Sequence, residues 1–378
     1  MGSFLQTRSL ESRLAAFMRA ACVRLGICLF FVSRAFSFEW TLIKHDGRDY
    51  VPVDDVAKFY SFSQTSYSGD MVRLEGATLR MQGGVNSREL YLNGLKFILS
   101  YPVIKVDNKV LLSRIDLSKL VDPVLRPARI QGAPAKTIVL DAGHGGYDQG
   151  ALGTFGSEKD FAFDVVMRAR DLLTRAGYSV RLTRSSDVFL PLESRANFAN
   201  RQRNAIFVSV HFNAGRPDSE GIETFGLAPQ GVPSTNDYVP SINDFRPCVG
   251  NVRDSENIAL ATAMHTALIT KMRTYDRGIK RARFVVLRDI NIPGVLIEGG
   301  FLSNSQDGIR IATPQYRQLL AQSILQGVQS YNRAMARGTG QIMAKRDTTP
   351  GGGQTSVPKN MSIWDPLKAG MYVLPERN

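Results

Sequence analysis

The sequence predicts an α/β fold: an open, mostly parallel sheet flanked by helices in the second half of the chain, preceded by a small α+β domain. From Thr137 onward, short apolar strands alternate with long helices, which is typical of α/β domains. Between Trp40 and Arg126, short strands and turns surround only one or two short helices. Two prolines mark residues 127–136 as the linker between these regions.

Length and composition agree with a globular protein of several domains. The 378 residues correspond to two to three domains of about 150 residues each. Hydrophobic residues make up 43% and charged residues 21%, which excludes wholesale disorder, collagen-like repeats and long heptad repeats. Three cysteines are too few for a disulfide framework or a four-cysteine zinc site. The net charge of +13 favours an anionic partner, whether nucleic acid, a phospholipid surface or an acidic polymer.

Residues 1–37 are predicted to be a secretory signal peptide. Four arginines precede the apolar run Leu25–Val32, and a small-x-small site comes next at Ala35 to Ser37. The alternative is an amphipathic surface helix, because apolar and basic residues also alternate here. No run of about 18 apolar residues occurs, so no transmembrane anchor is expected. We therefore expect an exported protein of the periplasm or cell envelope.

Residues 38–126 are predicted to be a small α+β binding module. The segment Asp49–Tyr60 combines a strand, an Asp cap and an apolar-periodic helix, and Lys109–Val121 repeats that order, which suggests two related halves. Alternating strands lie between them. This pattern resembles the module named after the amino-terminal region of copper amine oxidases, found on envelope proteins. With His45 as its only histidine, we expect no metal here.

The α/β region, residues 137–336, is predicted to contain six strands and four long helices, followed by a disordered tail at residues 337–378 that is rich in Gly, Thr, Lys and Pro. The strands are expected at Thr137–Leu140, Ser179–Leu182, Ile206–Val210, Ile222–Phe225, Phe284–Leu287 and Gly294–Ile297. The helices are expected at Asp160–Ala176, Leu192–Arg203, Ser255–Lys271 and Pro314–Arg333.

Three of these strands end in an ionisable residue followed by small residues. His144, His211 and Glu298 each come just after an apolar run. Because ligands bind in the crevice at the carboxyl ends of strands in open α/β sheets, we expect these three side chains to converge. Neighbouring glycines would let the backbone approach closely.

Two histidines and a carboxylate suit a zinc ion with one open position for water. Glu158, at the start of the helix after the first strand, is the candidate third ligand beside His144 and His211. Glu298 is then free to act as general base and general acid, while zinc lowers the pKa of its bound water towards ~7. The four placements together predict a zinc-dependent hydrolase.

Each residue also has a structural interpretation. Glu158 lies in a capping-box pattern, Ser157 to Asp160. His144 could be a loop residue and His211 a hydrogen-bonded core histidine. Glu298 is harder to explain structurally, because a carboxylate directly after a buried strand needs a partner. His265 lies within an apolar helix and is expected to be a packing residue.

At these residues the region resembles the zinc-dependent N-acetylmuramoyl-L-alanine amidases, the bacterial cell-separation amidases. The motifs that carry the resemblance are DAGHGG (141–146), the glutamate-lysine-aspartate helix start (158–160), LESRANFAN (192–200), SVHFNA (209–214), GIETF (221–225) and IEGGFLSN (297–304). The resemblance implies that His144, Glu158 and His211 are zinc ligands and that Glu298 is the catalytic glutamate. It also implies hydrolysis of the amide between N-acetylmuramic acid and the L-alanine of the stem peptide, in cell-wall remodelling or cell division.

Further site residues are assigned less directly from the same motifs. Asn213 and Arg195 are candidate substrate-binding residues or supports of the metal ligands, and Arg195 could equally form a structural ion pair. Glu223 is a candidate for orienting a ligand histidine. A large residue, Phe212, stands where family members usually carry a small one, so substrate contacts near the metal are expected to differ.

An insert at residues 228–254 departs from the family pattern. In cell-division members, an insert near this position forms an inhibitory helix. Here the segment is rich in proline and lacks a helical apolar period, so we predict an irregular loop at the rim of the site.

Two alternative functions stay open from the sequence. One is a catalytically inactive peptidoglycan-binding protein, and the other is a zinc peptidase or deacetylase that acts on a different amide. The absence of an HExxH motif excludes thermolysin-type peptidases. Peptidoglycan is the expected partner, and the sequence does not identify an activator protein. Nucleic acid is not expected, because no nucleic-acid module occurs, whereas attraction to anionic wall polymers should weaken with salt.

Overall fold

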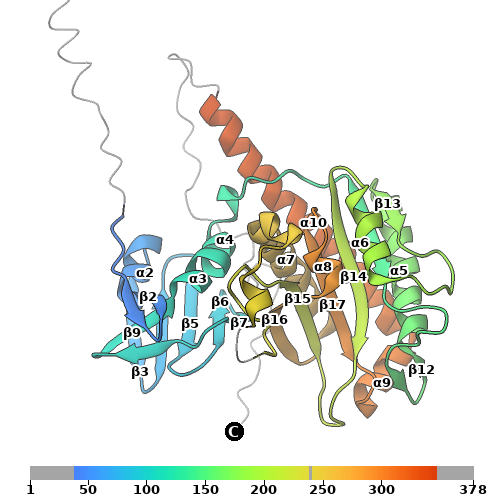
Figure 1. The fold of residues 1–378 in the computed structure, drawn as a ribbon, viewed down its shortest axis with the longest axis horizontal. Helices are drawn as coiled ribbons and strands as arrows, with labels where there is room; N and C mark the ends of the chain where they lie inside the picture. The colour runs from blue at the N-terminus through green and yellow to red at the C-terminus, as the bar shows by residue number, and fades with distance from the viewer. Residues whose placement is uncertain (1–37, 238–240, 347–378) are drawn as a thin grey trace, which may run out of the picture. The chain divides into compact units, whose positions relative to one another are not determined.

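The computed structural model describes residues 38–237 and 241–346, with side chains up to residue 337, and its described residues from Thr41 onward form one compact unit (Figure 1). The largest sheet has the strand order β13-β10-β14-β17-β15-β16-β7-β6-β5-β4-β3. None of the described helices combines the length and apolarity needed to cross a bilayer. The predicted signal peptide, residues 1–37, lies outside the described residues.

The second half of the chain contributes six strands to this sheet. Strands β13, β10, β14 and β17 are parallel, β15 is antiparallel to β17, and β16 is parallel to β15. The predicted α/β class is confirmed. The strands are β10 (Thr137–Ala142), β13 (Ser179–Leu182), β14 (Ala205–Asn213), β15 (Ile222–Leu227), β16 (Asp276–Ala282) and β17 (Gly294–Phe301), and a separate hairpin is formed by β11 (Leu152–Gly153) and β12 (Gly156–Ser157).

Helices cover both faces of this part of the sheet, which explains why its central strands are apolar throughout. Helix α10 packs against α5 and α7 on one face, and α6 and α8 pack together over the other. Phe207, Phe225 and Leu296 belong to the buried cluster under α6 and α8. The helices are α5 (Glu158–Arg175), α6 (Leu192–Asn200), α7 (Asp254–Met272), α8 (Val285–Arg288), α9 (Ser305–Ala312) and α10 (Pro314–Arg346).

Two element predictions are wrong. The expected strand at Phe284–Leu287 is the short helix α8, and the actual strand is β16, which precedes it in the chain and is poor in apolar residues. Buried Arg281 and half-buried Lys280 form ion pairs, and they separate the apolar residues Ile279 and Ala282, so no apolar run marks this strand. Helix α10 continues to Arg346, because the first helix-breaking proline after residue 337 is Pro350. Residues 337–346 are therefore helical, and the rest of the predicted tail, 347–378, lies outside the described residues.

The first half of the chain forms a small four-stranded sheet and a meander. The repeated sequence pattern corresponds to two hairpins, β1–β2 and β8–β9, each followed by helix and joined by antiparallel pairing of β2 with β9. The elements are β1 (Ile43–His45), β2 (Arg48–Pro52), α2 (Val53–Tyr60), β3 (Gln64–Ser68), β4 (Met71–Glu75), β5 (Arg80–Gly84), β6 (Glu89–Leu92), β7 (Leu95–Ile98), β8 (Ile104–Val106), β9 (Lys109–Ser113), α3 (Arg114–Asp116), the π-helix η1 (Leu117–Val121), α4 (Asp122–Leu125) and the 3₁₀ helix η2 (Pro127–Arg129).

The two halves share one sheet and a buried ion pair. Strand β7 pairs with β16 in parallel, so the meander β3–β7 continues the sheet of the second half. Arg281 of β16 is buried and donates to Asp116 and to Ser100 Oγ at 2.6 Å. The segment expected to be a linker packs along α10, where the Asn332 amide exchanges hydrogen bonds of 2.8 and 2.9 Å with the backbone of Ala135.

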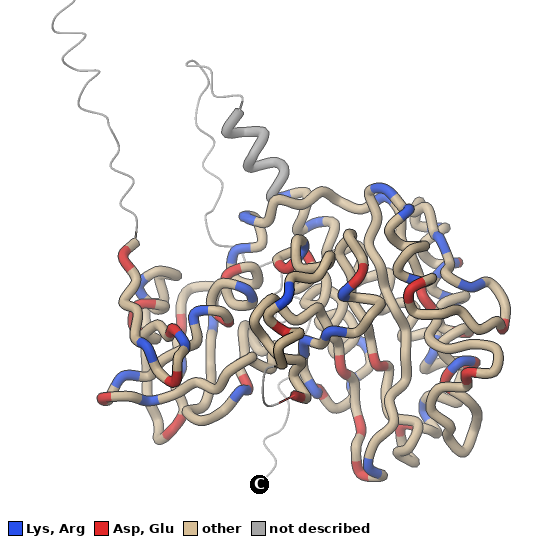
Figure 2. Tube along the Cα trace, in the orientation of Figure 1, with Lys and Arg blue, Asp and Glu red and all other residues tan. Residues whose placement is uncertain are grey.

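Charges of both signs are mixed along the described chain. Figure 2 shows Lys and Arg interleaved with Asp and Glu over both halves of the trace. Many of these charges are paired, including the contacts of Lys119 with Asp254 at 3.0 Å and of Lys96 with Glu89 at 2.6 Å. The positive balance is therefore dispersed along the chain rather than gathered in one segment.

Candidate metal centre and active site

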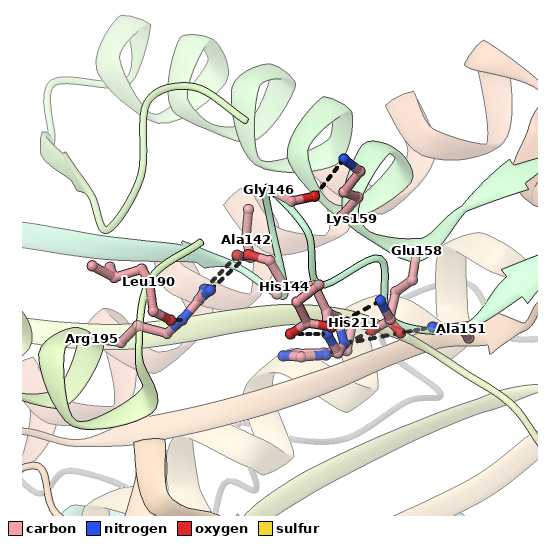
Figure 3. A network of polar contacts seen from close by, with 12 residues as sticks. Ala142, His144, Gly146, Ala151, Glu158, Lys159, Leu190, Arg195 and His211 are labelled. Atoms are coloured by element: carbon pink, nitrogen blue, oxygen red, sulfur yellow. Dashed lines mark hydrogen bonds and ion pairs between the residues drawn. The ribbon is translucent and has the colours of Figure 1, made fainter. Parts of the chain in front are cut away.

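The three predicted metal ligands lie together. His144, Glu158 and His211 each offer a donor atom within 4.8 Å of the other two, and the described residues contain no second cluster of this kind. The Nε2 atom of His144 lies 3.0 Å from Oε2 of Glu158, and Nδ1 of His211 lies 2.7 Å from Oε1 of the same carboxylate (Figure 3). One buried carboxylate therefore bridges two imidazoles.

Sheet topology brings these side chains to one edge. His144 follows β10, His211 lies near the end of β14, and Glu298 lies in β17, directly opposite His211 in the parallel register. Parallel strands expose their carboxyl ends at the same edge of a sheet, as the sequence predicted. Glu158 opens helix α5 and reaches the same edge from the connection after β10.

The turn after β10 depends on glycine. His144 itself has φ +57°, and Gly145 and Gly146 continue in the left-handed region, where a residue without Cβ is least strained. A Cβ on Gly143 would lie 2.4 Å from the His211 ring, and one on Gly150 would lie 2.5 Å from both Glu158 Oε2 and the His144 ring. The glycines thus leave the space that the donor side chains occupy.

Further hydrogen-bond partners fix the orientation of the metal-donor side chains His144 and Glu158. Asp148 Oδ2 lies 2.9 Å from Nδ1 of His144, the ring nitrogen that faces away from Glu158. The Glu158 carboxylate accepts backbone N–H groups from Ala151 at 2.8 Å and Phe212 at 3.2 Å. Carboxylates in this position hold a ligand histidine in one tautomer and orientation. Asp148 was not predicted from the sequence, although an acid four residues after a candidate ligand histidine was a usable signal.

The electrostatics of this cluster keep Glu158 ionised. Burial opposes the charge on Glu158, but His144 and His211 outweigh it and hold the pKa of this carboxyl well below its ordinary value. Burial also lowers the pKa of His144, and the contacts with Glu158 and Asp148 reverse that effect and raise the pKa above its ordinary value. Glu158 is therefore an anion that two imidazoles already stabilise.

Glu298 stands beside this cluster as an unpaired carboxyl. Its Oε2 atom is buried and has no hydrogen-bond partner among the residues that the structure describes. Burial raises the pKa of Glu298 well above its ordinary value, and the negative charges of Glu158 and Glu223 raise it further, while Lys280 acts in the opposite direction. A carboxyl whose pKa is raised in this way suits proton transfer near neutral pH.

The donor set fits zinc. Imidazole nitrogen and carboxylate oxygen are ordinary zinc ligands, and tetrahedral bonds of 2.0–2.1 Å place donor atoms about 3.3 Å apart. One donor atom of each of His144, Glu158 and His211 lies within 4.8 Å of the others, which is close enough for the three to share one ion. Three protein donors leave a fourth position for water or substrate.

Arg195 lies against the backbone of the turn that carries His144. Its guanidinium is buried, pairs with Asp141 at 2.9 Å, and donates to the carbonyl oxygens of Ala142 at 2.7 Å and His144 at 2.7 Å (Figure 3). Its Nε donates to Leu190 O at 2.9 Å. Of the three predicted roles, these contacts match the structural ion pair and the support of a metal ligand, since Arg195 holds the His144 turn.

Asn213 and Glu223 form a network next to Glu298. Glu223 lies opposite Glu298 in the antiparallel pair of β15 and β17. It accepts from Asn213 Nδ2 at 3.4 Å, from Lys280 at 2.8 Å and from Arg277. Among the described residues none of these contacts joins Glu223 to a ligand histidine, so its predicted role in orienting one has no support in the geometry.

His265 is fully buried away from the donor cluster. Its ring nitrogens lie 2.8 Å from Thr224 Oγ1 and 2.8 Å from Asp276 Oδ1. This bonding ties α7 to β15 and β16, in agreement with the packing role that the sequence predicted.

The described residues of the insert, 228–237 and 241–254, do not line the site. Because β15 is antiparallel to β17, its carboxyl end, where the insert begins, lies at the edge of the sheet opposite Glu298. The insert is irregular, with 3₁₀ helices η3 (Ile242–Phe245) and η4 (Val249–Arg253), and Arg283 holds it through the carbonyl oxygens of Pro229 and Asp244, both at 2.8 Å. The predicted rim position is wrong, since the sequence did not reveal the reversal of β15.

Phe212 lies beside the donors through its backbone, while its ring packs in the core. Its N–H donates to Glu158 Oε1 at 3.2 Å, and its buried ring packs edge-on against Phe161 of α5, with centroids 6.2 Å apart. The expectation that Phe212 changes substrate contacts near the metal stays a prediction.

The fold and donor set define a class: α/β enzymes that gather two histidines and a glutamate for a metal at the carboxyl ends of parallel strands. Residues 138–330 match the family described as N-acetylmuramoyl-L-alanine amidase, and the chain belongs to that family.

Two named relatives and one solved structure are similar to this chain. The uncharacterized protein YqiI of Bacillus subtilis is 34% identical over 197 residues, which cover 52% of this chain and 84% of that protein. The N-acetylmuramoyl-L-alanine amidase AmiC of Escherichia coli is 30% identical, over 57% of this chain and only 58% of its own length. The solved catalytic domain of the amidase CwlV from Bacillus (Paenibacillus) polymyxa is 30% identical with a TM-score of 0.44, over 53% of this chain and 99% of that one.

Proposed function

We propose that this protein is an exported zinc-dependent peptidoglycan hydrolase that cleaves the amide between N-acetylmuramic acid and the L-alanine of the stem peptide. Family membership supports the reaction, and the cluster of His144, Glu158 and His211 supports the metal. The observation that carries the proposal is the buried, unpartnered Oε2 of Glu298, which lies directly opposite His211.

His144, Glu158 and His211 would hold the zinc ion. Bound zinc polarises a carbonyl group and lowers the pKa of water towards ~7. The chain's own contribution is to fix these donors: Asp148 orients His144, and the backbone N–H groups of Ala151 and Phe212 orient Glu158.

Glu298 supplies the proton transfers. It accepts a proton from the water whose oxygen attacks the amide carbonyl carbon. When the carbon–nitrogen bond breaks, Glu298 donates that proton to the departing amine of L-alanine. Lys280 and Arg277 neutralise Glu223 opposite Glu298, which limits repulsion between the two carboxyls and so allows Glu298 to ionise.

The remaining parts have proposed roles in the envelope. Residues 1–37 would direct export, 38–126 would form the small envelope-binding module, 127–136 would join it to the catalytic domain at 137–336, and 337–378 would follow as a tail. The positive balance of +13 supports attraction to anionic wall polymers, and such attraction should weaken with salt.

The proposal is tested by digesting purified peptidoglycan with the chain lacking residues 1–37 and identifying the soluble products by mass spectrometry. Stem peptides that begin with a free L-alanine amine are expected, and they should disappear with a chelator and with Glu298→Ala. Binding to peptidoglycan without release of peptides would instead support an inactive wall-binding protein. Release of peptides cut at another amide, or of acetate, would support the peptidase or deacetylase alternative.

A further inference from the structure

Two aromatic rings lie exposed next to the metal donors. Tyr147 follows the His144 turn, and Phe189 belongs to the loop between β13 and α6. The rings stack with centroids 4.4 Å apart and an interplanar angle of 29°, although 79% of Tyr147 and 38% of Phe189 remain exposed. Exposed and paired aromatic rings are typical of binding surfaces, because an isolated pair contributes little to a folded core.

The backbone beneath the rings is fixed. Asp187 Oδ1 accepts the Gly146 N–H at 2.8 Å, and Lys159 Nζ donates to both Gly146 O at 2.9 Å and Asp187 Oδ2 at 2.7 Å. A Cβ on Gly146 would lie 2.7 Å from the backbone nitrogen of Phe189, so the two loops touch closely. The rings are therefore presented by a preorganised support, which reduces the entropy lost on binding.

The same support is tied to the metal donors. Gly146 lies two residues after His144, and Lys159 directly follows Glu158 (Figure 3). Arg184 joins the segments from beneath by donating to Gly143 O at 2.9 Å and Lys159 O at 2.8 Å. A molecule that rests on Tyr147 and Phe189 would thus be held at a fixed position relative to the donors.

We propose that Tyr147 and Phe189 form a platform for a sugar ring of the glycan strand, an inference that rests on the proposed amidase function. The scissile amide joins a pyranose on one side to a peptide on the other. A pyranose presents C–H groups on its faces, and these pack on the negative face of an aromatic ring. The stem peptide carries carboxylates, but Lys159 beside the platform is already paired with Asp187, and Arg184 is buried and donates to backbone carbonyl oxygens. The charge balance therefore favours the sugar.

The test uses the chain with bound zinc and soluble muropeptides that carry the disaccharide and a stem peptide. Tyr147→Ala and Phe189→Ala should each raise KM about three- to tenfold, the size of one lost aromatic contact. The kcat value should stay within about twofold, since a platform binds ground state and transition state alike. Tyr147→Phe keeps the ring and should have the KM of the parent protein. Phe245 is an exposed aromatic residue at the other end of the sheet, and Phe245→Ala should leave KM unchanged.

Product inhibition identifies the occupant. Peptide-free disaccharide should inhibit the parent protein competitively and should inhibit Tyr147→Ala more weakly, whereas inhibition by free stem peptide should be equal in both. Unchanged KM, or a selective loss of stem-peptide inhibition, would overturn the platform. If the parent protein cleaves no muropeptide, the proposed function fails, and direct NMR titration with the same disaccharide still decides whether the two rings bind sugar.

Discussion

Burying a carboxyl oxygen without a partner costs stability, and Oε2 of Glu298 has no partner among the described residues. We expect Glu298→Gln to lower kcat by about 10²- to 10⁴-fold, because it removes the group that transfers the proton. Zinc content should not change, since Glu298 is not among the three clustered donors. Metal analysis beside kcat measures both effects, and Glu75→Gln, on an exposed strand position, is the control. Loss of zinc from Glu298→Gln would contradict this assignment.

Asp148 contacts His144, a proposed metal ligand, and would act on the metal through it. Removing a carboxylate that orients a ligand histidine typically weakens metal affinity by about 10- to 100-fold. We expect Asp148→Asn to have this effect in a competition titration with a chromogenic zinc chelator. Asp171→Asn, at an exposed acid of α5, should leave zinc affinity unchanged. Equal affinities for both variants would show that Asp148 only shapes the turn.

At the scale of elements, Asp141 joins four of them beneath the site. It lies in β10, pairs with Arg195 of α6 at 2.9 Å, and accepts from Ser209 of β14 at 2.7 Å and from Thr183 after β13 at 2.5 Å. Burial opposes its charge, but Arg195 and the two hydroxyls outweigh burial and hold the pKa of Asp141 below its ordinary value.

This lowered pKa predicts how stability depends on pH. A carboxyl with a lower pKa in the folded state stabilises the fold above its unfolded pKa of about 3.9, and that contribution is lost as pH falls through the folded value. We therefore expect the free energy of unfolding, measured with urea between neutral and acid pH, to fall towards low pH. Asp141→Asn should lower stability at neutral pH and flatten this fall. An unchanged slope would assign the acid sensitivity to other carboxyls.

The insert at residues 228–254 is an element that supports the sheet at the end away from the metal. Deleting residues 232–250 removes Thr235, which accepts from Arg88 at 3.0 Å, and Asp244, which accepts from Arg283. We expect a lower melting temperature and an unchanged kcat for the protein that stays folded. A faster reaction after the deletion would show instead that the insert restricts access to the site.

For the whole molecule, the contact between Arg281 and Asp116 joins the first half of the chain to the second. Both side chains are buried, and Asp116 also accepts from Ser113 Oγ at 2.6 Å. Asp116→Ala leaves a buried guanidinium without its counter-charge, which should cost about 3–5 kcal/mol of unfolding free energy. Asp49→Ala breaks the exposed pair with Arg114 and should cost at most about 1 kcal/mol. Equal costs in urea unfolding would show that the two halves are energetically independent.

The sequence by itself predicted the α/β class and the four residues that the structure brings to one edge of the sheet. His144, His211 and Glu298 each follow an apolar run. The run indicates a buried strand, and the residue that follows it lies where the strand reaches the edge of the sheet. Glu158 could be assigned as well, since the start of the next helix lies at the same edge. Each of these signals lies within a short stretch of the chain, so a single sequence is enough to find it.

Only the tertiary structure decided the partners of these residues. Strand order and direction decide whether Glu223 faces a histidine or Lys280. They also decide whether the insert lies at the rim and whether Arg281 contacts Asp116. Strand β16 was missed because Lys280 and Arg281 interrupt its apolar positions, and their charges are satisfied by ion pairs with Glu223 and Asp116. Pairings between distant segments are set by the energy of the whole packed sheet, and a local pattern along the chain does not report that energy.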